Sequence, residues 1–232
     1  MPPLLLFLFI AFAIVLGIGV LLAVVLPKRR SSAEPRPALP RREEDSGADG
    51  ERFMTSVLSS FICSEHDHLM NGVILYNPKN GASCEIDHIL IFSRGIFVIE
   101  TKNRAGDIYG DGTREEWRQV LADGNIVHSM RSPVLQNATH VRFVKEILFR
   151  KLRASIPVKG YVVFVRGNIR HIDSPDVCTP FTLGRILGEY PERLSPAERD
   201  RAYRALRAHL EKYPVTKEEH LRYIRSRHPD EP

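Results

Sequence analysis

Cysteine is scarce in this chain, and the spacing of its cysteines excludes two kinds of site. The 232 residues include three cysteines, Cys63, Cys84 and Cys178, and no C-x-x-C pair. A structural zinc site is not expected without paired spacing. An odd number of cysteines without a disulfide pattern is typical of a reducing compartment. The simplest interpretation is that all three are small buried hydrophobic residues.

Charge is absent from the front of the chain. No residue from Pro3 to Leu26 is charged, and about 20 apolar residues, at a rise of about 1.5 Å each, cross the hydrocarbon core of a bilayer as a helix. We therefore expect a transmembrane helix over residues 1–26, with residues 3–26 in the membrane. A cleaved signal peptide is the alternative, but it usually has a basic front and a shorter apolar stretch.

Basic residues follow this apolar run at once, beginning with Lys28, Arg29 and Arg30. Such residues resist translocation and contact anionic headgroups. We therefore expect a single-pass protein of the cell membrane, with the N-terminus outside and the C-terminal domain in the cytoplasm. Residues 27–50 contain four prolines, mixed charges and few large apolar residues, which predicts a flexible linker. The formal net charge of +5 suits nucleic acid or an anionic membrane equally.

Beyond the linker, the apolar pattern predicts an α/β domain over residues 51–170 and a C-terminal helical extension over residues 171–232. Apolar residues recur at helical spacing from Glu51 and again after Pro133, and continuous apolar runs between and after them indicate strands. Two arginine-rich helices are expected near 196–212 and 217–227. Paired strands followed by a helix and another strand indicate a mixed α+β sheet flanked by helices.

The most informative segment is an expected hairpin over residues 84–101. Two apolar runs are joined by the short turn Ser93-Arg94-Gly95. Pairing across this turn places Asp87, at the head of the first strand, beside Glu100, at the tail of the second. Glu100 and Lys102 are two residues apart, so they share one face of the strand. The sequence therefore predicts two carboxylates and one ammonium gathered at one end of the sheet.

Such a cluster has a chemical use. Mg²⁺ takes hard oxygen ligands, often one or two carboxylates together with waters and a substrate phosphate. The bound ion lowers the pKa of a water and stabilises charge at the scissile phosphate. Lys102 could orient or deprotonate the attacking water and offset phosphate charge. Without a cation, Asp87 and Glu100 would repel each other, and one would tend to hold its proton.

Several motifs around this hairpin together indicate a family. They are Gly50-Glu51, Ile86-Asp87-His88, the run from Gly95 to Asn103, Gly106, Ile108, Gly110, Trp117 and Ser132-Pro133-Val134-Leu135-Gln136-Asn137. In these residues the chain resembles the nuclease-related domain (NERD) family, a branch of the restriction-endonuclease-like fold with its D…(D/E)-x-K signature. The resemblance covers roughly residues 50–165. Ser132 departs from the family's Asn-Pro-x-x-Gln motif, where Asn is usual.

The resemblance implies a restriction-endonuclease-like α/β fold and a nuclease that uses Mg²⁺ or Mn²⁺, with nucleic acid, DNA in the first place, as its partner. It also implies that Asp87 and Glu100 are metal ligands and catalytic residues. Lys102 would be the catalytic lysine, and Glu51 a possible further metal ligand. Gln136 would contact substrate or water near the start of its helix.

Other interpretations stay open at this point. Asp87, Glu100 and Lys102 could form a surface ion-pair cluster of little energetic value, or a site that has lost its activity. Glu51 could simply be an acid favoured at a helix start, and Gln136 a capping residue. The whole domain could be a non-enzymatic membrane-tethered module that binds nucleic acid or protein. The arginine-rich C-terminal helices could contact phosphates or be solvated surfaces.

Overall fold

The computed structural model describes residues 43–121, 124–154 and 156–227. Residues 1–42 lie outside the described residues, and with them the expected transmembrane helix and most of the expected linker. Within the described ranges, no helix is both long and apolar enough to cross a membrane.

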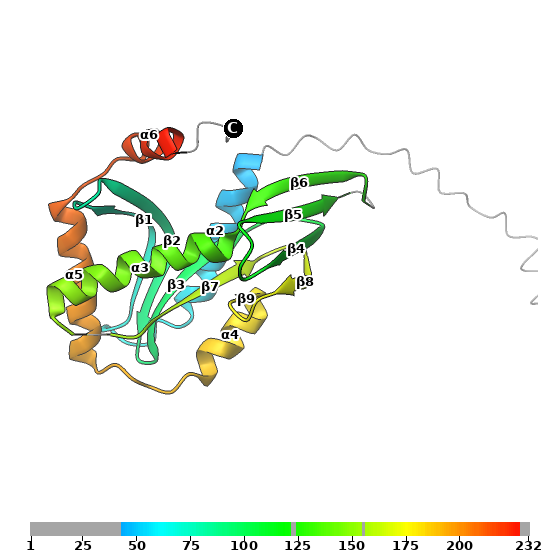
Figure 1. The fold of residues 1–232 in the computed structure, drawn as a ribbon. Helices are drawn as coiled ribbons and strands as arrows, with labels where there is room; N and C mark the ends of the chain where they lie inside the picture. Colours follow the sequence, from blue (N-terminus) through cyan, green and yellow to red (C-terminus); the bar gives the residue numbers. More distant parts are fainter. Residues whose placement is uncertain (1–42, 122–123, 155, 228–232) are drawn as a thin grey trace, which may run out of the picture. The chain divides into compact units, whose positions relative to one another are not determined.

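The described elements follow the expected order closely, with one earlier start (Figure 1). Helix α2 begins at Glu43, so residues 43–50 belong to a helix and not to the linker expected there. The helices are α2 (Glu43–Ser59), α3 (Pro133–Leu152), α4 (Pro180–Glu189), α5 (Pro196–Lys212) and α6 (Lys217–Arg227). The strands are β1 (His68–Asn77), β2 (Ala82–Phe92), β3 (Gly95–Lys102), β4 (Asp107–Asp111), β5 (Glu116–Leu121), β6 (Ile126–Arg131), β7 (Val158–Phe164), β8 (Asn168–Asp173) and β9 (Val177–Cys178).

A five-stranded mixed sheet forms the centre, in the order β1-β2-β3-β7-β9. The first three strands are antiparallel, and β3, β7 and β9 are parallel. Strand β3 is buried along seven of its eight residues, from Gly95 to Thr101. Burial on both faces explains its continuous apolar sequence.

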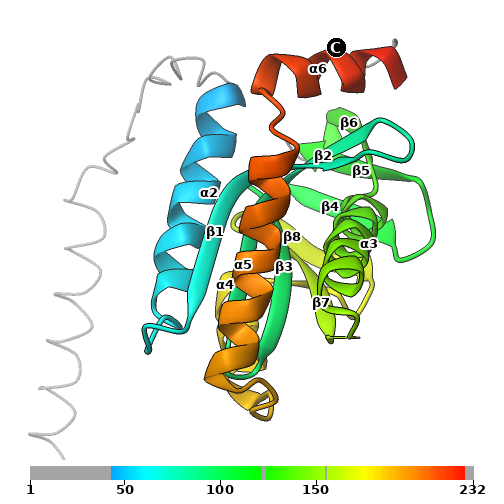
Figure 2. The same cartoon turned by 90° about the vertical axis from the view of Figure 1, so that its left-hand side faces the viewer.

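Helices cover both faces of this sheet. On one face, Val144 and Leu148 of α3 and Leu206 of α5 pack with Ile89 and Val98 in the main core. On the other face, α2 and α4 contribute Met54, Leu58, Leu183 and Leu187 to a second core with Leu90, Phe97 and Ile99. Figure 1 shows α3 lying across β3 and β7, and Figure 2 shows α5 beside β1. The fold is therefore the expected mixed sheet flanked by helices, consistent with a restriction-endonuclease-like fold.

A second sheet, in the order β6-β5-β4-β8, extends from the C-terminal ends of β3 and β7. Trp117 of β5 is fully buried there and packs with Ile108 and Phe164. Strand β8 pairs with β4, and β9 pairs with β7. The segment after residue 170 is thus not a purely helical extension, because it adds strands to both sheets and α5 to the main core.

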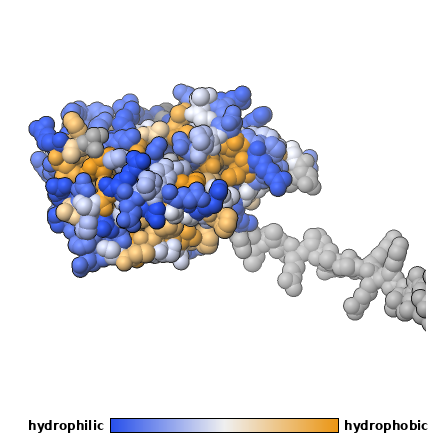
Figure 3. Space-filling view, turned by 90° about the horizontal axis from the view of Figure 1, so that it is seen from below, coloured by the Kyte–Doolittle hydropathy of each residue, from blue (hydrophilic) through white to orange (hydrophobic). Residues whose placement is uncertain are grey.

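The two ends of the β2–β3 hairpin face different parts of the molecule. At the turn, Ser93 O accepts hydrogen bonds from the backbone N–H groups of Arg193 and Leu194, which lead from α4 into α5. Figure 3 shows the side on which α4 lies, with hydrophobic patches among hydrophilic residues; Phe181 of α4 is 85% exposed. The candidate site lies at the other, open end of the hairpin.

Candidate active site

The β2–β3 register brings Asp87 and Glu100 together as predicted. The strands pair from Phe92 with Gly95 to His88 with Ile99, so Asp87 and Glu100 are the next positions along the same register. The backbone N–H of Thr101 donates a hydrogen bond of 2.7 Å to Asp87 Oδ2. The Asp87 side chain therefore turns toward the tail of β3.

The usual alternation of side chains breaks where Asp87 lies opposite Gly72. Met70 and Ile89 lie in the main core before this point, and Leu75 and Ile86 lie in the same core after it. Gly72 has φ 58°, in the left-handed region that favours glycine. The break leaves Asp87 only partly buried between two fully buried isoleucines, Ile86 and Ile89.

Glu100, Lys102 and Gln136 form a chain of contacts. Lys102 Nζ lies 2.6 Å from Glu100 Oε1, so the two side chains share one face of β3 as predicted. The same ammonium donates a hydrogen bond of 3.2 Å to Gln136 Oε1. Gln136 is exposed on the first turn of α3, which begins at Pro133 after the Ser132 cap. Gln136 therefore contacts the site, and Ser132 does the capping: its hydroxyl accepts from Leu135 N.

His140 is a site residue that the sequence reasoning missed. Its Nδ1 lies 3.3 Å from Glu100 Oε2, and both side chains are almost completely buried, 6% and 3% exposed. Neither atom has a well-aligned hydrogen bond within the described residues. The available signal was its position one helical turn after Gln136, on the same side of α3.

Burial and neighbouring charges shift the pKa values of Asp87 and Glu100 in opposite directions. Burial raises the pKa of Asp87 well above its ordinary value, and the neighbouring Glu100 raises it further. Burial acts in the same direction at Glu100, but Lys102 and His140 outweigh it and hold the pKa of Glu100 below its ordinary value. Without a cation, the pair therefore favours an ionised Glu100 and a protonated Asp87.

Glu51 reaches the same neighbourhood from α2, without a direct contact to either carboxylate. Burial raises the pKa of Glu51, and the nearby carboxylates of Glu85 and Glu100 add to this effect. Helix α2 comes close to the end of β3 because Gly50 has no side chain: a Cβ there would lie 2.7 Å from Asn103 Cβ. Glu85 is a further acid near the site, and the sequence reasoning gave it no role.

The donor set suits a cation that needs few protein ligands. Among the residues that the structure describes, no group of three or more His, Cys, Asp or Glu side chains is arranged to hold a metal, so Glu51 is not gathered with Asp87 and Glu100 into a closed cage. Glu100 Oε2 is a buried acceptor without a hydrogen bond, an atom that a cation would satisfy. Carboxylate oxygens match Mg²⁺ or Mn²⁺ better than zinc, which favours cysteine and histidine ligands.

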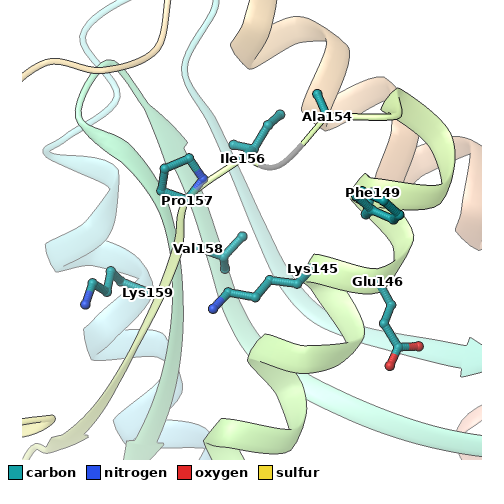
Figure 4. A pocket seen from close by; sticks show the side chains of 8 residues that line it. All are labelled: Lys145, Glu146, Phe149, Ala154, Ile156, Pro157, Val158 and Lys159. Atoms are coloured by element: carbon teal, nitrogen blue, oxygen red, sulfur yellow. The ribbon is translucent and has the colours of Figure 1, made fainter.

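Two adjoining cavities lie beside this site and not on it. They run between α3 and β7, have volumes of about 540 and 310 Å³, and share Lys145, Val158 and Lys159. Figure 4 shows the larger one, in which the Lys145 ammonium points toward β7. Asn137 lines the smaller one, and its Nδ2 donates to Val98 O at 3.2 Å and Tyr161 O at 3.0 Å. Asn137 therefore fastens α3 to the two central parallel strands next to Gln136.

Comparison with known proteins identifies the family. Residues 46–165, about half of the chain, match the model of the nuclease-related domain. The chain belongs to the nuclease-related domain family. An uncharacterized protein from Bacillus anthracis is 30% identical over 106 residues, which cover 46% of this chain and 48% of that protein. The chain thus spans about half the length of this curated relative, and no solved structure matches it.

The nuclease-related domain contains the whole candidate site. Asp87, Glu100, Lys102, Gln136 and His140 all fall inside the matched segment. Helices α4, α5 and α6 fall outside it, although α5 packs into the main core. The family assignment makes the chain nuclease-related.

Proposed function

We propose that the nuclease-related domain hydrolyses phosphodiester bonds of DNA with the help of Mg²⁺ or Mn²⁺. The observation that carries this proposal is the contact of Lys102 Nζ with Glu100 Oε1 at 2.6 Å, beside the Glu100 Oε2 that has no hydrogen bond. A lysine held against one oxygen of a carboxylate whose other oxygen faces His140 without a well-aligned hydrogen bond, at the end of a sheet and next to a second carboxylate, suits a site for a cation and a phosphate.

In this proposal Asp87 and Glu100 would hold the cation, which when bound supplies a water of lowered pKa and stabilises charge on the phosphate. Glu100 is already favoured in its ionised form, and Asp87 would lose its proton on binding. Lys102 would place its ammonium near the phosphate or the attacking water. Gln136 would limit the motion of Lys102 from the helix side, and His140 would hold Glu100 from α3.

A cleavage assay tests the proposal. Full-length protein in detergent is incubated with plasmid DNA and Mg²⁺ or Mn²⁺, with and without EDTA, beside Glu100→Ala and the control Glu211→Ala. Glu211 is exposed on α5, and its one ion pair among the described residues is with Arg207 one turn away. We expect metal-dependent cleavage by wild type and Glu211→Ala and its loss in Glu100→Ala. Equal, metal-independent cleavage by all three proteins would exclude this function. DNA binding without cleavage or metal binding would favour the non-enzymatic module instead.

We further propose that residues 3–26 anchor the domain in the cell membrane, with residues 43–227 on the cytoplasmic side. Support comes from the uncharged apolar run and from Lys28, Arg29 and Arg30 directly after it. A tag placed after Pro232 should resist protease on intact cells and become sensitive when the cells are opened. Digestion of the tag on intact cells would contradict the orientation, and recovery of the protein in the soluble fraction would contradict the anchor.

A further inference from the structure

Helix α6 lies beside the candidate site, although it is more than 50 residues beyond the segment that matches the family. His220 of α6 is buried, and its Nδ1 lies 2.9 Å from Ser83 Oγ of β2. Lys217 Nζ forms an ion pair with both carboxylate oxygens of Glu85, also on β2. Figure 2 shows α6 across the end of the sheet near β2. Two side-chain contacts thus anchor α6 to the strand that carries Asp87.

The charge of Lys217 acts on a carboxylate that charges of the site also affect. Glu85 is two residues before Asp87, which corresponds to about 7 Å along a strand. The pKa of Glu51 is raised first by burial and then by Glu85, while both Lys217 and Lys102 lower it. The positive charges of Lys217 and Lys102 therefore both act on the Glu51 carboxylate. Lys217 is a second ammonium at the border of the site, carried by a different part of the chain.

The local structure of α6 does not explain a lysine at this position. A reciprocal cap fixes the helix start: Thr216 N donates to Glu219 Oε2 at 2.8 Å, and Glu219 N donates to Thr216 Oγ1 at 3.2 Å. A cation in the first turn is unfavourable toward the helix dipole. The cap therefore holds Lys217 in the first turn, although the helix dipole disfavours a cation there. The Nζ of Lys217 points to β2 and not to a partner on its own helix.

The pair between Lys217 and Glu85 is easily exchanged. The two side chains are 56% and 30% exposed, and exposed pairs contribute about 0–1 kcal/mol. A phosphodiester offers the ammonium the same single negative charge and the same pair of acceptor oxygens as the carboxylate it would replace. Beyond Lys217, α6 carries Arg222, Arg225 and Arg227 against two acids, Glu218 and Glu219. The helix thus offers an excess of positive charge next to the carboxylates.

We propose that α6 is part of the nucleic-acid-binding surface and that Lys217 contacts a substrate phosphate next to the one bound at Glu100 and Lys102. Glu85 holds the Lys217 ammonium at the border of the site until the phosphate replaces it. The inference rests on the proposed nuclease function, because it assumes a phosphodiester strand at the carboxylates. It adds a binding element from outside the nuclease-related domain.

DNA affinity tests this inference separately from cleavage. Anisotropy of a fluorescein-labelled DNA duplex is measured with full-length protein in detergent, with Ca²⁺ in place of Mg²⁺, between about 50 and about 200 mM salt. Lys217→Ala should weaken binding about 3- to 10-fold and lower the slope of log affinity against log salt by about one. Lys217→Arg should retain most of the affinity. The control Lys151→Ala removes a lysine from the last turn of α3, far from Gln136, and should change little.

A variant of Glu85, the residue that pairs with Lys217, distinguishes phosphate binding by Lys217 from a purely structural role of the pair. Glu85→Gln frees Lys217 from its carboxylate, so affinity should stay unchanged or rise. Equal losses in Lys217→Ala and Glu85→Gln would mean that the pair only holds α6 in place, and would overturn the inference. Unchanged affinity and slope in Lys217→Ala would also overturn it, while metal-dependent cleavage that is lost in Glu100→Ala would still support the nuclease function. Failure of the wild type both to bind and to cut DNA would end both proposals.

Discussion

His140 Nδ1 lies 3.3 Å from Glu100 Oε2, while Glu100 Oε1 contacts Lys102 Nζ at 2.6 Å. One buried carboxylate therefore links the central strand β3 to helix α3 and to the lysine of its own strand. Its two oxygens face different partners, and only the oxygen toward Lys102 has a well-aligned hydrogen bond. This asymmetry makes Glu100 the carboxylate on which the proposed chemistry depends most.

Lys102 should matter more for cleavage than Gln136. Lys102→Met removes the ammonium next to the phosphate, and a loss of about 10²- to 10³-fold in kcat is the usual size for a group that stabilises developing charge. Gln136 is exposed and acts through Lys102, so Gln136→Ala should cost only a few-fold. Single-turnover cleavage rates measure both, with Lys151→Met as the charge-matched control. Comparable losses in both variants would assign Gln136 a direct role.

Substituting alanine for two glycines of α2, Gly50 and Gly47, should change the free energy of unfolding in different ways. At Gly50 a Cβ would lie 2.7 Å from Asn103 Cβ, whereas at Gly47 nothing lies within 4 Å. Gly50→Ala should therefore push α2 away from β3 and cost about 1–3 kcal/mol of the free energy of unfolding. Gly47→Ala should be neutral or stabilise by up to about 1 kcal/mol, because alanine is the better helix former. Urea titrations measure both; a harmless Gly50→Ala would disprove the close packing.

Asn137 should not tolerate aspartate. Its Nδ2 donates to the carbonyl oxygens of Val98 and Tyr161 in the buried sheet. Asn137→Asp would set a carboxylate against two carbonyl oxygens, and leaving such groups unsatisfied costs about 1–3 kcal/mol each or more. Asn80→Asp is the control, because Asn80 Oδ1 only accepts from Ala82 N and a carboxylate can do the same. Thermal unfolding should separate the two variants clearly; equal melting temperatures would contradict the fastening role.

His88 should make stability depend on pH. Burial lowers its pKa to about 4 from an ordinary value of 6.5, although Glu100 acts in the other direction. Between these pH values the unfolded chain binds a proton that the folded chain excludes, so the stabilisation is complete above about pH 6.5 and is lost as the pH falls toward 4. The full effect is about 3 kcal/mol.

Urea titrations of wild type and His88→Gln at several pH values measure this contribution. The readout is the slope of stability against pH, so a general loss of packing in the variant does not affect it. We expect a shallower slope in His88→Gln between about pH 6.5 and about pH 4. Identical slopes in the two proteins would show that His88 titrates alike in the folded and unfolded chains.

The hairpin was predictable from the sequence because its information is local. A short turn fixed the register, which pairs His88 with Ile99 and so brings Asp87 near Glu100, and the alternation of side chains along β3 put Glu100 and Lys102 on one face. The helices over 196–212 and 217–227 were also found, since α5 and α6 have these same bounds. Where one segment determines its own conformation, residue spacing and composition were enough to predict the element.

The remaining features depend on contacts between distant segments. Strand β9 has only two residues and pairs with β7, so no periodicity could reveal it. The break of alternation at Gly72 needs the opposite strand to be seen. His140 enters the site only because Asn137 and the close approach at Gly160 bring α3 onto the sheet: a Cβ at Gly160 would lie 2.7 Å from Val141 Cγ2. Helix α6 reaches β2 only through tertiary packing.

Calorimetric titration of full-length protein with Mn²⁺ tests the central claim most directly, that Asp87 and Glu100 together hold a divalent cation. Wild type and the surface control Glu211→Gln should bind Mn²⁺ with the same affinity. Asp87→Asn and Glu100→Gln should each lose this binding while remaining folded by circular dichroism. Mn²⁺ affinity that is unchanged in Glu100→Gln, or absent from the wild type, would contradict the account.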